Sequence, residues 1–170
     1  MKNIFKIKKK INYKSRAGFS LVEVLIACVI ISLTTLALMS TASKGIELSN
    51  RALRQVQASM LIEEGVEAVK SIRDTNWETI SSLNLDTNYY LFFDTNTNTW
   101  SLSTTPESLV DEIFTRTVIL TAVNRDDNDD ISPSGTIDTG IKRVNVTVSW
   151  PSKNDTISKN ITFYLTDLFN

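Results

Sequence analysis

The hydrophobic and polar positions divide the chain into three parts. Residues 19–39 form an apolar run that contains one charged residue, and a polar leader precedes it. As a helix, these 21 residues would reach about 31 Å, which is enough to cross the hydrocarbon core of a membrane. The helical pattern continues beyond the run and is predicted to end near Arg73, where the third, polar and aromatic part begins.

The second half of the predicted helix has two distinct faces. Its broad apolar face recurs at helical spacing and consists of Leu61, Ile62, Gly65, Val66, Ala68, Val69 and Ile72. This face is wider than the seam of a coiled coil, so we expect it to pack against a sheet. A narrower apolar stripe lies upstream, formed by Leu53, Val56 and Met60. The pattern leaves open whether this stripe belongs to the core or contacts another subunit.

The rest of the chain is predicted to form a small antiparallel sheet. Residues 89–93 and 100–102 are expected to pair as a hairpin, and residues 113–123 to form a longer strand rich in β-branched side chains. Apolar and polar residues alternate over residues 141–150, which places Val144, Val146, Val148 and Trp150 on one face, and they alternate again over residues 161–165. Residues 151–155 between them are expected to form a turn. The short connections favour antiparallel pairing. The predicted fold class is therefore α+β, with a long N-terminal helix packed on a small antiparallel sheet.

Charge is distributed unevenly along the chain. Seven of the 18 Lys and Arg residues lie within residues 1–18, which contain none of the 19 Asp and Glu residues. A short basic terminus of this kind indicates topology or targeting, and the positive-inside rule predicts that it stays in the cytoplasm. The remainder is acidic, so we expect no basic face on the folded domain and no direct binding of nucleic acid.

The chain carries few residues suited to catalysis. It has no His, and its one Cys, Cys28, lies within the apolar run. This composition excludes His-dependent catalysis, His metal sites and an intrachain disulfide. The polar C-terminal part contains Ser, Asp and Lys residues but no recognisable catalytic constellation. We therefore expect neither enzymatic activity nor a cofactor, and we keep a membrane-tethered enzyme as a minor alternative.

One acidic segment is a weak candidate for a metal site. Asp126, Asn128 and Asp130 occupy alternate positions, as in the first half of a calcium-binding loop. However, Ile131 stands where such a loop has Gly, and Ile137 stands where it has a bidentate Glu. We therefore predict a solvated connection between strands and assign no metal ligand.

The apolar run itself has three interpretations. A secretory signal cleaved after Ala42 would have suitable small residues, but the run is longer than a normal signal core and contains Glu23. A plain uncleaved anchor would not explain this carboxylate, since a lone charge in a membrane span costs about 2.5–3.5 kcal/mol on insertion scales. The third interpretation takes Gly18, Phe19 and Glu23 together.

Residues 18–23, Gly-Phe-Ser-Leu-Val-Glu, closely resemble the cleavage and methylation motif of type IV prepilins and pseudopilins. The resemblance rests on a Gly before the cut, a Phe after it, a Glu at the fifth position and an apolar helix under a basic leader. It implies that a membrane aspartyl protease, prepilin peptidase, cuts after Gly18 and methylates the new amine of Phe19. Glu23 would then pair with the amine of a neighbouring subunit and set the axial register.

The resemblance implies a structural subunit of a pilus or a type II secretion-like pseudopilus. Its implied partners are prepilin peptidase, other pilin subunits, and an inner-membrane assembly platform with its ATPase. The implied organisation is a removed leader (1–18), a transmembrane helix (19–39), an amphipathic continuation (40–73) and an extracytoplasmic head (74–170). The β-rich head suggests a minor pilin or minor pseudopilin. The alternative is a membrane-tethered adhesin or binding module that does not polymerise and would not need Glu23.

Overall fold

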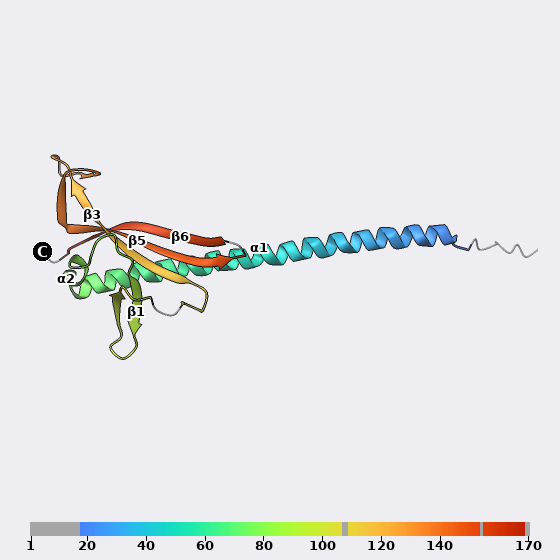
Figure 1. Cartoon of the computed structure of the whole chain (residues 1–170), viewed down its shortest axis with the longest axis horizontal. Helices are drawn as coiled ribbons and strands as arrows, with labels where there is room; N and C mark the ends of the chain where they lie inside the picture. The colour runs from blue at the N-terminus through green and yellow to red at the C-terminus, as the bar shows by residue number, and fades with distance from the viewer. Residues whose placement is uncertain (1–17, 107–108, 154, 169–170) are drawn as a thin grey trace, which may run out of the picture. The chain divides into compact units, whose positions relative to one another are not determined.

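The computed structural model describes residues 18–106, 109–153 and 155–168, so most of the predicted leader lies outside the described residues. Its helices and strands follow in the order α1 (Leu21–Thr75), α2 (Trp77–Ser81), β1 (Tyr90–Asp94), β2 (Thr99–Ser103), β3 (Thr115–Arg125), β4 (Ile131–Ser132), β5 (Thr136–Ser152) and β6 (Asp155–Thr166) (Figure 1). Neighbouring strands pair antiparallel. The predicted α+β class is therefore confirmed.

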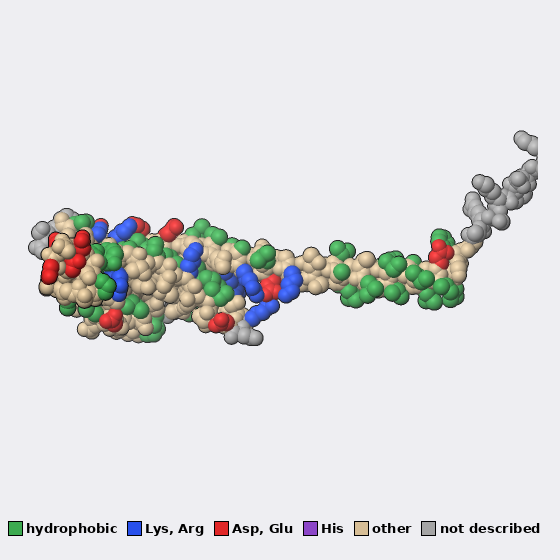
Figure 2. All heavy atoms as spheres, turned by 90° about the horizontal axis from the view of Figure 1, so that it is seen from above, with side chains coloured by type: hydrophobic (Ala, Val, Ile, Leu, Met, Phe, Trp, Pro, Cys, Tyr) green, Lys and Arg blue, Asp and Glu red, His purple; other side chains and the backbone are tan. Residues whose placement is uncertain are grey.

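The chain forms two compact units, residues 1–48 and residues 49–170, and α1 contributes to both. In the described part of the first unit, residues 18–48, every side chain is exposed except the half-buried Glu47. Apolar side chains are correspondingly visible on the surface of this part of α1 (Figure 2). The helix is long and apolar enough to cross a membrane, judged by length and composition.

The second unit contains two sheets. One has four strands in the order β4-β3-β5-β6, and the other is the β1-β2 hairpin. Tyr89, just before β1, exchanges two backbone hydrogen bonds with Val118 on β3, of 2.9 and 2.8 Å. These bonds attach the hairpin to the larger sheet. The predicted hairpin is confirmed, with Tyr90 opposite Ser103 and Asp94 opposite Thr99.

The last part of α1 packs on the larger sheet through its predicted apolar face. Six of the seven predicted residues are buried, and Val66 is half-buried. Gly65 marks the closest approach, because a Cβ added there would lie 2.9 Å from Cγ1 of Val146. On β5, the predicted inward residues are buried: Val144, Val146, Val148 and Trp150. The broad face thus packs against a sheet, as predicted.

Several strand boundaries differ from the prediction. β3 is displaced by two residues from the predicted 113–123, and β5 extends beyond the predicted 141–150 in both directions. Pro151 was expected in a turn but lies inside β5, which beyond Ser149 pairs with β6 and no longer with β3. Proline is tolerated at such a one-sided position because fewer ladder hydrogen bonds depend on its missing N–H.

β6 is an edge strand, and this weakens the burial expected from its alternating pattern. Leu165 is buried and Phe163 is half-buried, but Ile161 is 43% exposed. The short helix α2 was not predicted. Asn76 caps it by accepting a 2.8 Å hydrogen bond from the backbone N–H of Glu78.

Candidate functional site

The Gly18–Phe19 peptide bond lies in an exposed, non-helical segment just before α1. Phe19 is 83% exposed. The hydrogen-bonded backbone begins after it, where the N–H groups of Glu23 and Val24 donate to the carbonyl oxygen of Ser20 at 3.0 and 3.1 Å. The segment is therefore accessible to a protease without unwinding the helix.

Glu23 lies in the first turn of α1, where a negative charge is stabilised by the helix dipole. Its side chain is exposed, and its carboxylate has no hydrogen-bond or ion-pair partner among the described residues. In water this carboxylate would be solvated. In an apolar environment it would instead require a cationic or hydrogen-bonding partner from another molecule.

Three hydroxyl groups farther along the same apolar run behave differently from Glu23. Each donates to a backbone carbonyl three or four residues earlier, at 2.8–2.9 Å; the donors are Ser32, Thr34 and Thr35. Because these hydroxyl groups are hydrogen-bonded within the helix, placing them in an apolar environment costs little free energy. Glu23 is therefore the residue of residues 19–39 whose polar side chain most requires an external partner.

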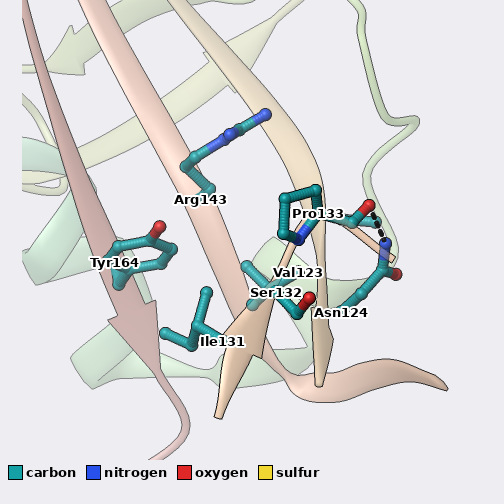
Figure 3. A pocket seen from close by; sticks show the side chains of 8 residues that line it. Val123, Asn124, Ile131, Ser132, Pro133, Arg143 and Tyr164 are labelled. Atoms are coloured by element: carbon teal, nitrogen blue, oxygen red, sulfur yellow. Dashed lines mark hydrogen bonds between the residues drawn. The ribbon is translucent and has the colours of Figure 1, made fainter. Parts of the chain in front are cut away.

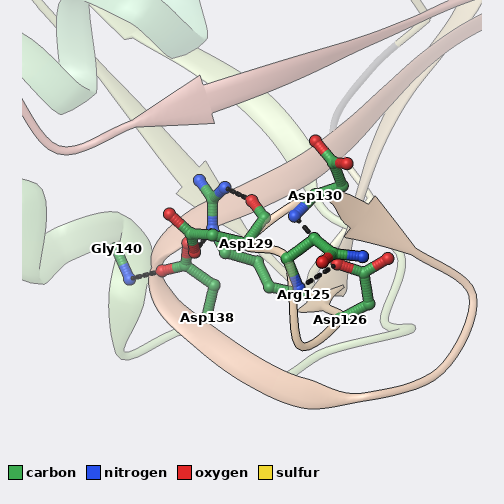
Figure 4. Close-up of polar contacts among 7 residues, drawn as sticks. Arg125, Asp126, Asp129, Asp130, Asp138 and Gly140 are labelled. Carbon is green, nitrogen blue, oxygen red and sulfur yellow. Dashed lines mark hydrogen bonds and ion pairs between the residues drawn. The ribbon is translucent and has the colours of Figure 1, made fainter.

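The acidic segment forms the exposed turn between β3 and β4, as predicted for a connection between strands. Oδ1 of Asp126 accepts hydrogen bonds from the backbone N–H groups of Asn128 and Asp130, at 2.9 and 3.1 Å (Figure 4). This carboxylate therefore stabilises its own turn. Among the described residues, no group of three or more His, Cys, Asp or Glu side chains is arranged to hold a metal ion.

An ion pair fixes the base of this turn. Nε of Arg125 lies 2.6 Å from Oδ2 of Asp138, and Nη1 of Arg125 donates to the carbonyl oxygen of Asp129. The hydrogen bond from Arg125 lowers the pKa of Asp138, and the same bond raises the pKa of Arg125. Asp138 also accepts a 2.8 Å bond from the N–H of Gly140. These groups are therefore occupied in structural contacts.

Arg116 is a structural residue that the sequence analysis missed. It is buried on β3, and its Nη1 donates to the carbonyl oxygen of Leu61 and lies 3.1 Å from a carboxylate oxygen of Glu64, both on α1. Its guanidinium carbon also lies 5.4 Å from the ring centroid of Trp100 on β2. Arg116 therefore ties α1, the larger sheet and the hairpin together. The sequence could have indicated this burial, because Arg116 alternates along β3 with the buried Val118 and Leu120 and therefore points to the same face of the sheet.

The narrow apolar stripe on α1 does not belong to the core. Leu53, Val56 and Met60 are 57%, 51% and 63% exposed. The first of the two possibilities left open by the sequence is therefore wrong, and these side chains are free to contact another molecule.

Comparison with known proteins identifies the N-terminal segment. A family model described as the prokaryotic N-terminal methylation motif matches residues 13–39, which include Gly18, Phe19 and Glu23. No curated protein and no solved structure matches the chain. The match covers the leader junction and the apolar run, and it confirms the recognition based on residues 18–23.

Proposed function

Since the chain carries the N-terminal methylation motif of the type IV pilin and pseudopilin family, we propose that it is a structural subunit of a type IV pilus or of a type II secretion-like pseudopilus. The observation that carries the proposal is the position of Glu23. It is a carboxylate without a partner among the described residues, in the first turn of an apolar helix and four residues after Phe19 of the Gly–Phe junction.

Processing would begin at the exposed junction. Prepilin peptidase would cut after Gly18 and methylate the amine of Phe19, which removes residues 1–18. The cut creates a cation near the start of the apolar helix, four residues before Glu23. The exposed, non-helical backbone at this junction supports the proposal because a peptidase must reach the scissile bond directly.

Assembly would pair the new charge with Glu23 of a neighbouring subunit. Each charge alone is costly in an apolar helix bundle, and each removes the other's desolvation problem when they meet. Because the nearby hydroxyl groups are satisfied within the helix, Glu23 is the polar group that depends most on the axial position of a neighbour. This pairing would therefore define the register of the filament.

The chain would first be inserted in the membrane with its basic leader in the cytoplasm. In this proposal residues 19–39 cross the membrane, residues 40–73 continue the helix, and residues 74–170 form the head outside. An inner-membrane platform and its ATPase would then drive extraction into an extracytoplasmic filament. The exposed stripe of Leu53, Val56 and Met60 supports such assembly, because neighbouring subunits would cover it.

Substitution of Glu23 tests this assignment. We expect Glu23→Ala to insert in the membrane normally, because it removes a charge from an apolar helix, and to lose incorporation into filaments in the native host. The matched control is Glu47→Ala, which removes a carboxylate from the same helix outside residues 19–39. Normal incorporation of Glu23→Ala would contradict the proposal and favour a tethered module that does not polymerise.

A further inference from the structure

The larger sheet carries a hollow on the face that points away from α1. It has a volume of about 410 Å³ and lies where β3, β4, β5 and β6 come together. Arg143, Tyr164, Ile131 and Pro133 are among the residues that line it (Figure 3). The volume is within the range of about 300–1,000 Å³ that is typical of small-molecule sites.

The hollow is assembled by strand register. Thr121 on β3 lies opposite Arg143 on β5, which in turn lies opposite Tyr164 on β6. These three residues therefore form one row across the outer face, because residues paired across strands point to the same side. Tyr164 is 49% exposed and presents an aromatic face.

Arg143 is held in place without being neutralised. Its Nε donates to Oγ1 of Thr121 at 2.9 Å, and that hydroxyl donates to the carbonyl oxygen of Arg143 at 3.3 Å. Its two terminal nitrogens have no partner among the described residues. By contrast, three other arginines of this unit each pair with a carboxylate; these are Arg73, Arg116 and Arg125. The guanidinium of Arg143 is therefore oriented and available for a carboxylate from outside.

The part of the lining that β4 and its adjoining loop contribute is also held in place. Ile131 is 47% exposed, and the adjoining loop is held where Nδ2 of Asn124 donates to the carbonyl oxygen of Pro133 at 3.2 Å. This part of the lining thus offers an apolar surface beside a polar backbone. The acidic side chains of residues 126–130 lie on the neighbouring turn and are exposed, so salt screens their charge.

The outer face next to the hollow consists mainly of uncharged hydrogen-bonding side chains. Four rows of residues paired across β3, β5 and β6 cover this face, from the row of Thr121 to the row of Thr115. Ser, Thr and Asn predominate in these rows, and Arg143 is the charged residue among them. A protein partner normally buries a contiguous apolar or aromatic area, which this face lacks. A polyhydroxylated ligand, in contrast, could form hydrogen bonds along it.

We propose that the hollow binds a hexuronate unit of an acidic polysaccharide. The carboxylate would accept paired hydrogen bonds from Arg143, the sugar ring would stack on Tyr164, and adjoining sugars would extend along the hydroxyl-rich face. The site lies within residues 49–170 and does not depend on filament assembly.

Titration of the full chain in detergent micelles tests the ligand class. We use trigalacturonate and the neutral galactotriose, which share the ring skeleton and differ at the carboxylates. Trigalacturonate should bind saturably by calorimetry, and galactotriose should bind about tenfold more weakly or not at all, because it lacks the charge-assisted bonds. Equal binding of the two sugars, or binding of neither, would overturn the proposal. So would displacement of trigalacturonate by an equimolar acidic peptide.

Substitutions test the assigned residues. Arg143→Gln should weaken trigalacturonate binding about tenfold or more, whereas Arg54→Gln should not, since Arg54 bonds to the carbonyl oxygen of Pro151 away from the hollow. Thr121→Val keeps the charge of Arg143 but removes the hydroxyl that orients its guanidinium, so it should weaken trigalacturonate binding less than Arg143→Gln does. Tyr164→Ala should also weaken binding, with Phe92→Ala on the other sheet as its control. An equal loss in Arg54→Gln would show non-specific attraction and contradict the site.

Discussion

The two parts of α1 belong to one helix but depend on different partners. Between residues 21 and 48 the apolar side chains are exposed, as with Ile30 at 56%, and no other residue in the described part of the first unit covers them. Between residues 58 and 72 the apolar side chains are buried against the larger sheet, as with Val69 at 0% and Ile72 at 4%, apart from the exposed Met60 and the half-buried Val66. Both parts are helical, but the second packs on a core of its own, whereas the apolar surface of the first would be covered by a membrane or by neighbouring helices.

The polar groups follow the same division. In the second unit, ion pairs such as Arg116–Glu64 and Arg125–Asp138 are closed within the chain. In the first unit, Glu23 has no such partner among the described residues. The buried guanidinium of Arg116 is thus paired within the chain, whereas the carboxylate of Glu23 would need a partner from outside it in an apolar environment.

The largest expected effect separates the two parts of α1 directly. We expect Ile72→Ala to lower the free energy of unfolding of the second unit by about 2–5 kcal/mol, because it leaves a cavity beside the sheet. Ile30→Ala makes the same change on an exposed part of the same helix and should leave that free energy unchanged. Urea unfolding in detergent, followed by Trp fluorescence, measures both. Similar losses in the two variants would contradict the comparison.

The two helical glycines provide a second matched pair. Gly65→Leu should destabilise the second unit by about 1–3 kcal/mol, because the new side chain would meet Val146 and Arg116. A Cβ at Gly45 would meet nothing within 4 Å, so Gly45→Leu should be neutral or slightly stabilising through its better helix propensity. The same unfolding measurement applies. A stable Gly65→Leu variant would show that α1 does not approach β5 as closely as described.

The smallest expected effect concerns pH. Arg125 lowers the pKa of Asp138 below its ordinary value of 3.8, so the ion pair contributes stability above that pH. This contribution is lost as the pH falls through the lowered pKa of the folded state. Asp138→Asn should therefore reduce stability slightly at pH 7 and weaken its dependence on pH in the acidic range. Asp127→Asn, on the neighbouring exposed turn between β3 and β4, is the control, and thermal melts between pH 2 and pH 7 would compare the two variants. An unchanged pH dependence in Asp138→Asn would contradict the role of the pair.

Local patterns in the sequence predicted the long helix, its buried face and the hairpin, because each depends on residues close together in the chain. The edge position of β6 could not be predicted, since it depends on strand order, and it explains why Ile161 is exposed despite its alternating pattern. β4 has two residues, too few to show a period of its own. The sequence also predicted a turn at Pro151. It does not show that the pairing of β5 with β3 ends at Ser149, which leaves one side of β5 free at Pro151.

The residues to which we propose a function show the same limit. Gly18, Phe19 and Glu23 were found because their spacing along the chain forms the motif itself. Arg143 and Tyr164 lie far apart in the sequence and become neighbours through the register of β5 and β6. The hollow could therefore be found only from the structure, whereas the proposed processing junction could be found from the sequence.

Mass spectrometry of the N-terminus tests the central claim most directly. The chain would be purified from membranes that contain the cognate prepilin peptidase, and its N-terminal peptide would be sequenced. The proposed function predicts a chain that begins at Phe19 with a methylated amine. A chain that retains Met1, or one that begins at Ser43 after cleavage by signal peptidase, would contradict it.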